Sequence, residues 1–285
     1  MRKPSAIEKE ALQVGTVKDL TAVFESLAST QVAKVKNKAA LSNEFFQLLW
    51  SRYSAIRVDP STRITNRASD ELNPRKVFVV ISAEAGLSGD IDQRLIETMA
   101  QDYDPTNTDV VVLGSHGATQ MRQRGIPYVR FFQVPESDRY IDVTPVIDAI
   151  ANYSSIIVYY EEYVSLSEQI IQSINLISEL KDMSEDADED VITAADTIFE
   201  PSLELIAEEM EKTMMTLVLS QSILESSLAQ AASRFNAMAV AKKRAGELLD
   251  DAMMEFHRAK RGESDRRMRE VMVSLKKKQR SRNSR

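Results

Sequence analysis

The carboxy-terminal part of the chain carries a heptad pattern that is long for a protein of 285 residues. Apolar or small side chains recur at spacings that alternate between four and three, and only Gln221 and Lys242 break the series. The seam positions are Met210, Met214, Leu217, Gln221, Leu224, Leu228, Ala231, Phe235, Met238, Lys242, Ala245, Leu249, Ala252, Phe256 and Ala259. This spacing is typical of a coiled coil. A helix from about Leu203 to Leu275 extends roughly 105 Å at 1.5 Å per residue. A globular domain of this size cannot bury that length, so the helix needs a second long helix as its partner.

The amino-terminal end supplies a candidate for that second helix. Residues 17–53 contain no glycine or proline, and their apolar side chains recur at helical spacing. These side chains are Leu20, Val23, Phe24, Leu27, Ala28, Val32, Val35, Ala39, Phe46 and Leu49. We therefore predict a shaft helix within residues 1–58, followed by a polar, turn-rich connector at residues 59–75.

Residues 76–182 change to the pattern of a compact α/β domain. Short β-branched runs at 76–82, 109–115, 127–134 and 154–160 predict strands. The segments 91–99, 118–125 and 142–153 between them predict helices. Strands that are apolar on both faces and alternate with helices indicate a parallel sheet. Residues 168–177 fit a helix or a strand equally well.

The remaining segments complete the predicted fold. An acidic linker is expected at residues 183–200, which include the run Glu185–Asp190, and a second shaft helix at residues 201–285. We predict a mixed α and β protein. Its two terminal helices form a long antiparallel coiled coil, and a central α/β head lies between them in the sequence. Small seam residues such as Ala231 and Ala245 allow the two helices to approach closely.

The side chains offer little chemistry for catalysis or ligand binding. Gly86 and Gly89 lie in "GLSGD" after the first predicted strand, but this loop matches neither glycine motif of nucleotide-binding proteins. We interpret it as a tight turn. The sequence places no partner carboxylate with His116, and the adjacent acids Glu161 and Glu162 point to opposite faces of a strand. There is no cysteine, and no His, Asp or Glu cluster has metal-ligand spacing. We expect no catalytic residue, nucleotide site, metal or other cofactor in this chain.

The charge distribution is uneven. The formal net charge is −7, yet Lys276–Arg285, "KKKQRSRNSR", is strongly basic. A basic tail can bind nucleic acid, but this one has no interleaved aromatic residues and the rest of the chain is acidic. We therefore expect no nucleic-acid partner.

Three sequence blocks resemble the gamma subunit of the F-type rotary ATP synthase. "ISAEAGLSGDID" is similar to the family segment I-T-S-D-R-G-L-C-G, and "SRFNAMAVAKKRAGELLDDAMMEFHRAKRGE" is similar, without gaps, to the family's carboxy-terminal block. "LTAVFESLASTQVAK" resembles the family's first helix. The matching positions are Ile81, Gly86, Leu87, Gly89, Arg234, Ala237, Met238, Ala241, Ala245, Arg258, Ala259, Thr21, Glu25, Ala28 and Lys34. The chain departs from the family at Glu84-Ala85, where an Asp-Arg pair is usual, and in its basic tail.

The resemblance implies a central rotor shaft, present in one copy per complex, with a Rossmann-like head. The shaft helices are expected to enter the bore of a hexamer of alpha and beta subunits, and the head to rest with the epsilon subunit on the membrane c-ring. Rotation would then couple proton or sodium flow to ATP synthesis or hydrolysis at the beta-subunit sites. The resemblance also implies a peripheral location on the cytoplasmic face of the bacterial cell membrane.

At the residue level, the resemblance implies that Arg234, Glu25 and Lys34 make coupling contacts with beta subunits. It also favours a strand for residues 168–177. Ala231, Met238, Ala245 and Phe256 are expected to be seam residues with no further role.

Two other functions are compatible with the residue pattern alone. A coiled-coil adaptor or chaperone with an α/β head, not part of a rotary motor, predicts a stable free homo-oligomer. A small α/β enzyme that uses the glycine loop predicts stabilisation by ligand, about 2.7 kcal/mol when the ligand is a hundredfold above its Kd.

Overall fold

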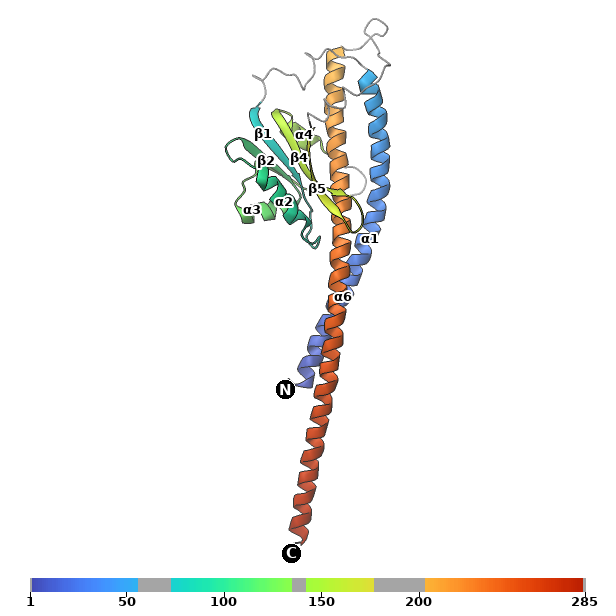
Figure 1. Cartoon of the computed structure of the whole chain (residues 1–285), viewed down its shortest axis with the longest axis vertical. Helices are drawn as coiled ribbons and strands as arrows, with labels where there is room; N and C mark the ends of the chain where they lie inside the picture. The colour runs from blue at the N-terminus through green and yellow to red at the C-terminus, as the bar shows by residue number, and fades with distance from the viewer. Residues whose placement is uncertain (1, 56–72, 135–141, 177–202, 284–285) are drawn as a thin grey trace. The chain divides into compact units, whose positions relative to one another are not determined.

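The computed structural model describes residues 2–55, 73–134, 142–176 and 203–283 (Figure 1). The chain divides into two compact units: unit 1 consists of Met1–Ser26 and Met238–Arg285, and unit 2 is Leu27–Ala237. Two long helices, α1 (Pro4–Ala55) and α6 (Leu203–Asn283), contribute residues to both units. Most of the predicted connector and all of the predicted acidic linker lie outside the described residues.

Helix α1 lies within the predicted residues 1–58 and begins at Pro4, well before the regular apolar spacing that starts near residue 17. Pro4 is its first residue, a position where the missing backbone N–H costs nothing because it has no intrahelical partner. Gly15, which lies inside the helix, weakens it locally by about 0.5–1 kcal/mol relative to alanine. Burial of Ile7 and Ala11 extends the helix across this weak position.

In unit 1 the two helices pair as an antiparallel coiled coil. Glu25 lies against Lys242 and Lys18 lies beside Gly246, so residue numbers rise along α1 as they fall along α6. On each helix a line of buried and partly buried positions alternates at spacings of four and three, with a few small residues such as Gly15, Ala22, Ala239 and Ala241 partly buried beside it. The line contains Ile7, Ala11, Val14, Lys18, Thr21 and Glu25 on α1, and Met238, Lys242, Ala245, Leu249, Ala252, Phe256 and Ala259 on α6. The predicted pairing of the two terminal helices is confirmed.

The large apolar residues that predicted α1 do not all lie on its buried face. Leu20, Val23 and Phe24 are 53, 56 and 39 % exposed, because they lie beside the seam rather than on it. Along this part of α1 the seam positions are Lys18, Thr21 and Glu25. The hydrophobic pattern therefore identified the helix but not the face that it buries.

Unit 2 contains a five-stranded sheet in the order β3-β2-β1-β4-β5. Strands β1 to β4 are parallel, and β5 runs antiparallel to β4. The strands are β1 (Asn73–Ile81), β2 (Thr108–Leu113), β3 (Arg130–Phe132), β4 (Tyr153–Tyr163) and β5 (Gln169–Asn175), and the short helices are α2 (Ile91–Asp102), α3 (Ser115–Arg124) and α4 (Thr144–Ile150). The segment left open between helix and strand is thus a strand. It departs from the predicted parallel sheet, because the short turn after β4 cannot span a crossover and returns the chain antiparallel.

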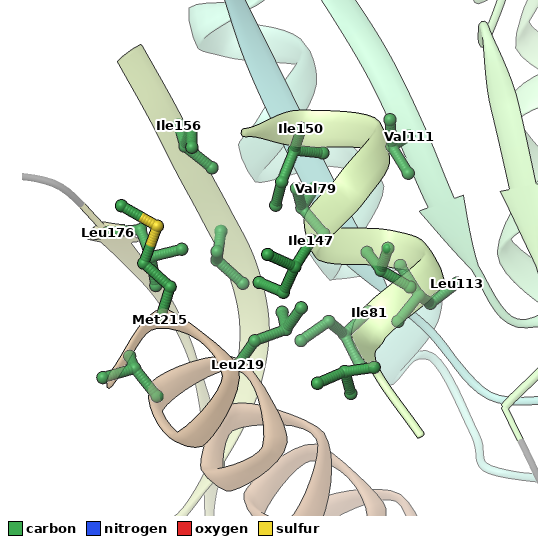
Figure 2. Packing of buried hydrophobic residues seen from close by; sticks show 14 of the residues in the cluster. Val79, Ile81, Val111, Leu113, Ile147, Ile150, Ile156, Leu176, Met215 and Leu219 are labelled. Carbon is green, nitrogen blue, oxygen red and sulfur yellow. The ribbon is translucent and has the colours of Figure 1, made fainter. Parts of the chain in front are cut away.

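Both faces of the sheet are covered, and strand alternation divides the core into two clusters. Phe78 and Val80 of β1 pack with α2 and α3, whereas Val79 and Ile81 pack with α4 and α6. Figure 2 shows Leu219 of α6 pointing toward Ile147 of α4 in the second cluster. The α/β head of the predicted fold is confirmed, with one addition: α6 forms part of its core.

That addition changes which side chains of α6 are buried in unit 2. Met215, Val218, Leu219 and Ile223 are at most 8 % exposed although none is a heptad position. The heptad residues Leu217, Leu224 and Phe235 are only partly buried here, while Leu228 and Ala231 are buried. Heptad spacing cannot indicate this second face, because it is buried by the sheet.

Within the described residues, no helix combines the length and the hydrophobicity that crossing a membrane requires.

Candidate functional site

The candidate site lies at the carboxyl ends of the parallel strands, where α6 meets the head. Strands β2 and β4 flank β1 on opposite sides, so the chain leaves the sheet in opposite directions on either side of this point. Doubly wound sheets bind their ligands in the crevice at such a switch point. Here the crevice residues form hydrogen bonds with side chains of α6. We use the term joint for these hydrogen-bonded groups together with five residues of α6: Ser226, Gln230, Ser233, Arg234 and Asn236.

The glycine loop after β1 is tied to α6 by two hydrogen bonds. The Ser233 hydroxyl donates to the Ser88 carbonyl at 2.6 Å, and Nη2 of Arg234 donates to the Ala85 carbonyl at 3.1 Å. Gly89 has a φ of +71°, which favours glycine, and a Cβ there would lie 3.6 Å from Ser233 Oγ. The predicted tight turn at Gly86–Gly89 therefore packs against α6 of the same chain.

A second loop is held in the same way. The side-chain amide of Asn236 donates to the Leu166 carbonyl, which lies in the turn between β4 and β5. Ser233, Arg234 and Asn236 lie within one helical turn, and each donates to a backbone carbonyl of the head. Carbonyls of two separate loops thus fix the rotation of α6 about its own axis.

A buried carboxylate organises the loop from the opposite side. Asp92, in the first turn of α2, is 1 % exposed. Its Oδ1 accepts from the Ala83 N–H at 2.8 Å, and its Oδ2 accepts from the Ser88 hydroxyl at 3.0 Å. Nδ1 of His116 lies 2.9 Å from the same Oδ2. The sequence did not identify this partner for His116, although Asp92 lies four residues after Ser88 in a loop-to-helix turn.

These three residues do not form a nucleophile–base pair. Ser88 is fully buried and its hydroxyl points to Asp92, and no hydrogen bond joins Ser88 to His116 in the described structure. A catalytic serine needs its base within hydrogen-bonding reach of the hydroxyl and needs access to substrate. The arrangement instead connects the end of β1, the glycine loop and the start of α3.

Glu161 of β4 is the second buried acid of the joint. Its side chain is fully buried, and Ser226 Oγ lies 3.1 Å from its Oε2. Burial raises the pKa of Glu161 well above its usual value, and the nearby charge of Asp92 raises it further. The polar side chains of Gln230 and Ser226 and the charge of Arg94 oppose this shift, although Gln230 itself donates to Ser226 Oγ rather than to the carboxyl group. As predicted, Glu162 points the other way and accepts a hydrogen bond from Gln172.

The three residues expected to couple the chain to its partners lie in different surroundings. Arg234 is in the joint, and burial lowers its pKa, against the opposing charges of Asp92 and Glu161. Glu25 is in unit 1, where its Oε2 lies 2.9 Å from Nζ of Lys242. Lys34 is on the part of α1 that belongs to unit 2, with an exposed side chain.

The pairing of Glu25 with Lys242 explains an irregularity of the sequence. Lys242 interrupts the heptad seam of α6, and Glu25 occupies a seam position on α1. Opposite charges at facing seam positions specify register in coiled coils at some cost in stability. The partner of Lys242 could not be identified from the sequence, because the offset between the helices is not encoded in either helix alone.

Among the described residues, no group of three or more His, Asp or Glu side chains is placed to hold a metal ion.

The comparisons with known proteins agree on one family. The family model described as ATP synthase matches residues 4–272. The ATP synthase gamma chain of Clostridium novyi is 21 % identical over 278 residues, covering 94 % of this chain and 95 % of the relative. The gamma chain of Chlorobium limicola is 23 % identical, covering 91 % and 93 %.

Solved structures give the same fold. A chain of the Euglena gracilis mitochondrial ATP synthase, from an assembly of OSCP, F1 and c-ring, matches with a TM-score of 0.67 at 13 % identity and covers 95 % of this chain and 94 % of its own length. A chain from the central stalk and c-ring of the Tetrahymena thermophila enzyme matches with a TM-score of 0.56 at 15 % identity, covering 78 % and 99 %. The antiparallel coil, the five-stranded head and the extent of the family match lead to one conclusion: this chain belongs to the ATP synthase family as a gamma chain, the central rotor shaft of that enzyme.

Proposed function

We propose that this chain couples rotation to ATP synthesis or hydrolysis by inserting the paired helices of unit 1 into the bore of an alpha–beta hexamer. It acts in one copy per complex, with its head against the c-ring and an epsilon subunit, as a peripheral protein on the cytoplasmic face of a bacterial membrane. Two solved relatives support the F1 and c-ring partners, since the Euglena gracilis chain comes from an assembly of OSCP, F1 and c-ring and the Tetrahymena thermophila chain from a central stalk with its c-ring.

The observation that carries the proposal is the apolar surface of the paired helices. On α1, Leu12, Val17, Leu20, Val23 and Phe24 are between 39 and 69 % exposed. On α6, Val240, Leu248, Met253 and Met254 are between 41 and 69 % exposed. Nine large apolar side chains exposed along one short pair of helices are more than a soluble coiled coil needs, and they indicate that a partner covers the pair. A sleeve of surrounding subunits would bury this surface on every side of the coil.

We further propose that Arg234 makes the main coupling contact with a beta-subunit loop. Its guanidinium has five N–H donors, and the described residues accept from one of its nitrogens, at the Ala85 carbonyl. The remaining donors allow Arg234 to bond the head and a second subunit together. Glu25 and Lys34 are proposed as weaker coupling contacts, with Glu25 limited by its bond to Lys242. The seam from Leu217 through Phe256 keeps the pair stiff enough to carry torque.

The first test is purification of this chain through a tag from its native membranes at low salt. Recovery of alpha and beta subunits in about threefold excess, with ATPase activity, is the expected result for a shaft in a cyclic ring. An epsilon subunit should accompany them. Recovery of a folded homo-oligomer without ATPase would contradict the proposal and support the adaptor.

The coupling contact is tested with Arg234→Ala in the assembled enzyme. Loss of a charge-assisted hydrogen bond, about 1.5–3 kcal/mol, predicts a roughly tenfold to hundredfold fall in ATP-driven ion pumping per ATP hydrolysed. Arg244→Ala, an exposed arginine on the same helix, is the matched control and should keep the wild-type ratio. Equal ratios in the two variants would remove Arg234 from the coupling contacts.

A further inference from the structure

The hydrogen-bond donors and acceptors around Ser226 fit a protonated Glu161 better than an ionised one. Ser226 Oγ lies 3.3 Å from the Ile81 carbonyl oxygen, 3.1 Å from Oε2 of Glu161 and 3.0 Å from Nε2 of Gln230. A hydroxyl group has one hydrogen to donate and two lone pairs to accept with. The Gln230 amide donates and the Ile81 carbonyl accepts. If Glu161 is ionised, the single hydroxyl hydrogen of Ser226 must be shared between the Ile81 carbonyl and Glu161; if Glu161 carries a proton and donates it to Ser226, each of the three contacts has a hydrogen of its own.

The other oxygen of Glu161 leads to the same conclusion. Oε1 is buried and has no hydrogen-bond partner within the described residues. A buried carboxylate without partners on one oxygen is costly, whereas a carbonyl oxygen of a protonated acid tolerates this much better. Asp92, by contrast, uses both carboxyl oxygens in hydrogen bonds, accepting from the Ala83 amide and from the Ser88 hydroxyl.

The charged groups around Glu161 do not supply it with a counter-ion in hydrogen-bonding contact. From α2, Asp92 repels a second negative charge and Arg94 attracts it. From α6, Arg234 interacts electrostatically with Glu161, but its hydrogen bond goes to the Ala85 carbonyl. From α3, His116 is bonded to Asp92. On β4 itself Glu162 faces away, and β5 contributes Ile171 opposite Glu161.

We propose that Glu161 is a positioning residue that holds α6 in the crevice through its protonated carboxyl group, so that ionisation of Glu161 loosens the joint between the shaft helix and the sheet. The joint then has two states, tight with the proton and loose without it. This inference concerns contacts within the chain, and it does not depend on which groups couple the chain to its partners.

The direction of the pH effect follows from proton binding. The folded joint binds the Glu161 proton more tightly than the opened joint does, because burial raises the pKa in the folded state. The stability that this proton contributes is fully present below the ordinary value of 4.5 and is lost as the pH rises toward the folded-state pKa. Across this window, protection against opening falls by about tenfold per pH unit for one linked proton.

The test is hydrogen exchange of the α6 segment 222–234 in the purified ATP synthase complex, from pH 5 to pH 8, corrected for intrinsic exchange rates. We expect wild-type protection to fall by up to about tenfold per pH unit and then to level off. Glu161→Gln, whose amide donates to Ser226 at every pH, should remove the slope. Glu162→Gln, the adjacent acid that faces away, should keep it.

A flat wild-type profile, or an unchanged slope in Glu161→Gln, would overturn the proposal. If Glu161→Gln does not fold, Asp92→Asn gives the decision instead. Removal of the Asp92 charge makes Glu161 easier to ionise, so protection should level off at a lower pH than in the wild type. An Asp92→Asn profile that levels off at the wild-type pH would also overturn the proposal.

Discussion

At the residue scale, Gly114 shows how little space the carboxyl edge of the sheet leaves. It lies between β2 and α3 with a φ of +98°, and an added Cβ would lie 2.2 Å from the Ser82 carbonyl oxygen. Ser82 is itself held by its hydroxyl bond to the Leu113 carbonyl at 2.7 Å, so it cannot move aside. A glycine is therefore required here both for backbone conformation and for space.

We predict that Gly114→Ala destabilises the full chain by about 3 kcal/mol or more, since both strain and overlap act at this position. Gly15→Ala is the matched control, because a Cβ at Gly15 meets nothing within 4 Å and the position is helical. That substitution should stabilise the chain by about 0.5–1 kcal/mol. Urea denaturation of both variants measures the difference, and a tolerated Gly114→Ala would show that the edge can relax.

Residue-scale prediction from the sequence found the turn but missed the joint. Gly86 and Gly89 were interpreted as a tight turn because their loop matches neither glycine motif of nucleotide-binding proteins, and Gly89 does have a positive φ. Glu161 could not be identified, since its burial depends on α6 crossing the end of β4, and that packing joins residues far apart in the sequence. A glutamate in an apolar strand was the available signal.

At the element scale, the pair Glu25–Lys242 sets the register of the coil in unit 1. The side chains are 21 and 43 % exposed, so the pair is partly shielded from water. We predict a coupling energy of about 0.5–1 kcal/mol from the double-mutant cycle of Glu25→Gln and Lys242→Gln, decreasing at high salt.

The exposed pair Arg266–Glu270 on α6 is the control for this cycle. Its side chains are 70 and 69 % exposed, and its coupling energy should be close to zero. If the two pairs gave the same energy, Glu25–Lys242 would have no special role in the register.

A second element-scale prediction concerns the double use of α6. Leu219 is fully buried against the sheet although it is not a seam residue. Leu219→Ala should therefore cost about 2–5 kcal/mol of unfolding free energy. Leu20→Ala, at a site that is 53 % exposed on α1, should change the unfolding free energy of the full chain by less than about 0.5 kcal/mol. A small effect at Leu219 would mean that α6 is not part of the head core.

The elements and the pairing of the two long helices were predictable from the sequence, whereas the residues that face each other across the pair were not. Periodicity of 3.6 or 2 is a local property, so both long helices and the five strands were found from the sequence, the last strand with help from the family resemblance. Which face of α1 is buried depends on its partner helix. Thr21 and Glu25 lie in the seam, whereas the larger Leu20 and Phe24 lie outside it. Hydrophobicity alone favoured the wrong face.

At the scale of the whole molecule, the exposed face of α1 is meaningful only in an assembly. Leu20 and Phe24 are one helical turn apart, and both remain exposed while smaller and charged residues fill the coil. A chain selected to fold alone would place its large apolar residues in the seam, because each one buried stabilises the fold by about 1.5–3 kcal/mol. We therefore expect Leu20 and Phe24 to be buried by a partner subunit and not by the coil itself.

The last prediction concerns the contact between Leu20 and a partner subunit. Leu20→Glu should leave the unfolding of the full chain nearly unchanged, because the side chain is already exposed to water. In the enzyme it would place a charge against an apolar sleeve, so recovery of alpha and beta subunits with the tagged chain should fall by about tenfold or more. Gln13→Glu adds the same charge at an exposed polar position of α1 and should assemble more nearly like the wild type. Normal assembly of Leu20→Glu would mean that this face does not meet the hexamer, and equal losses in both variants would point to charge rather than to the apolar face.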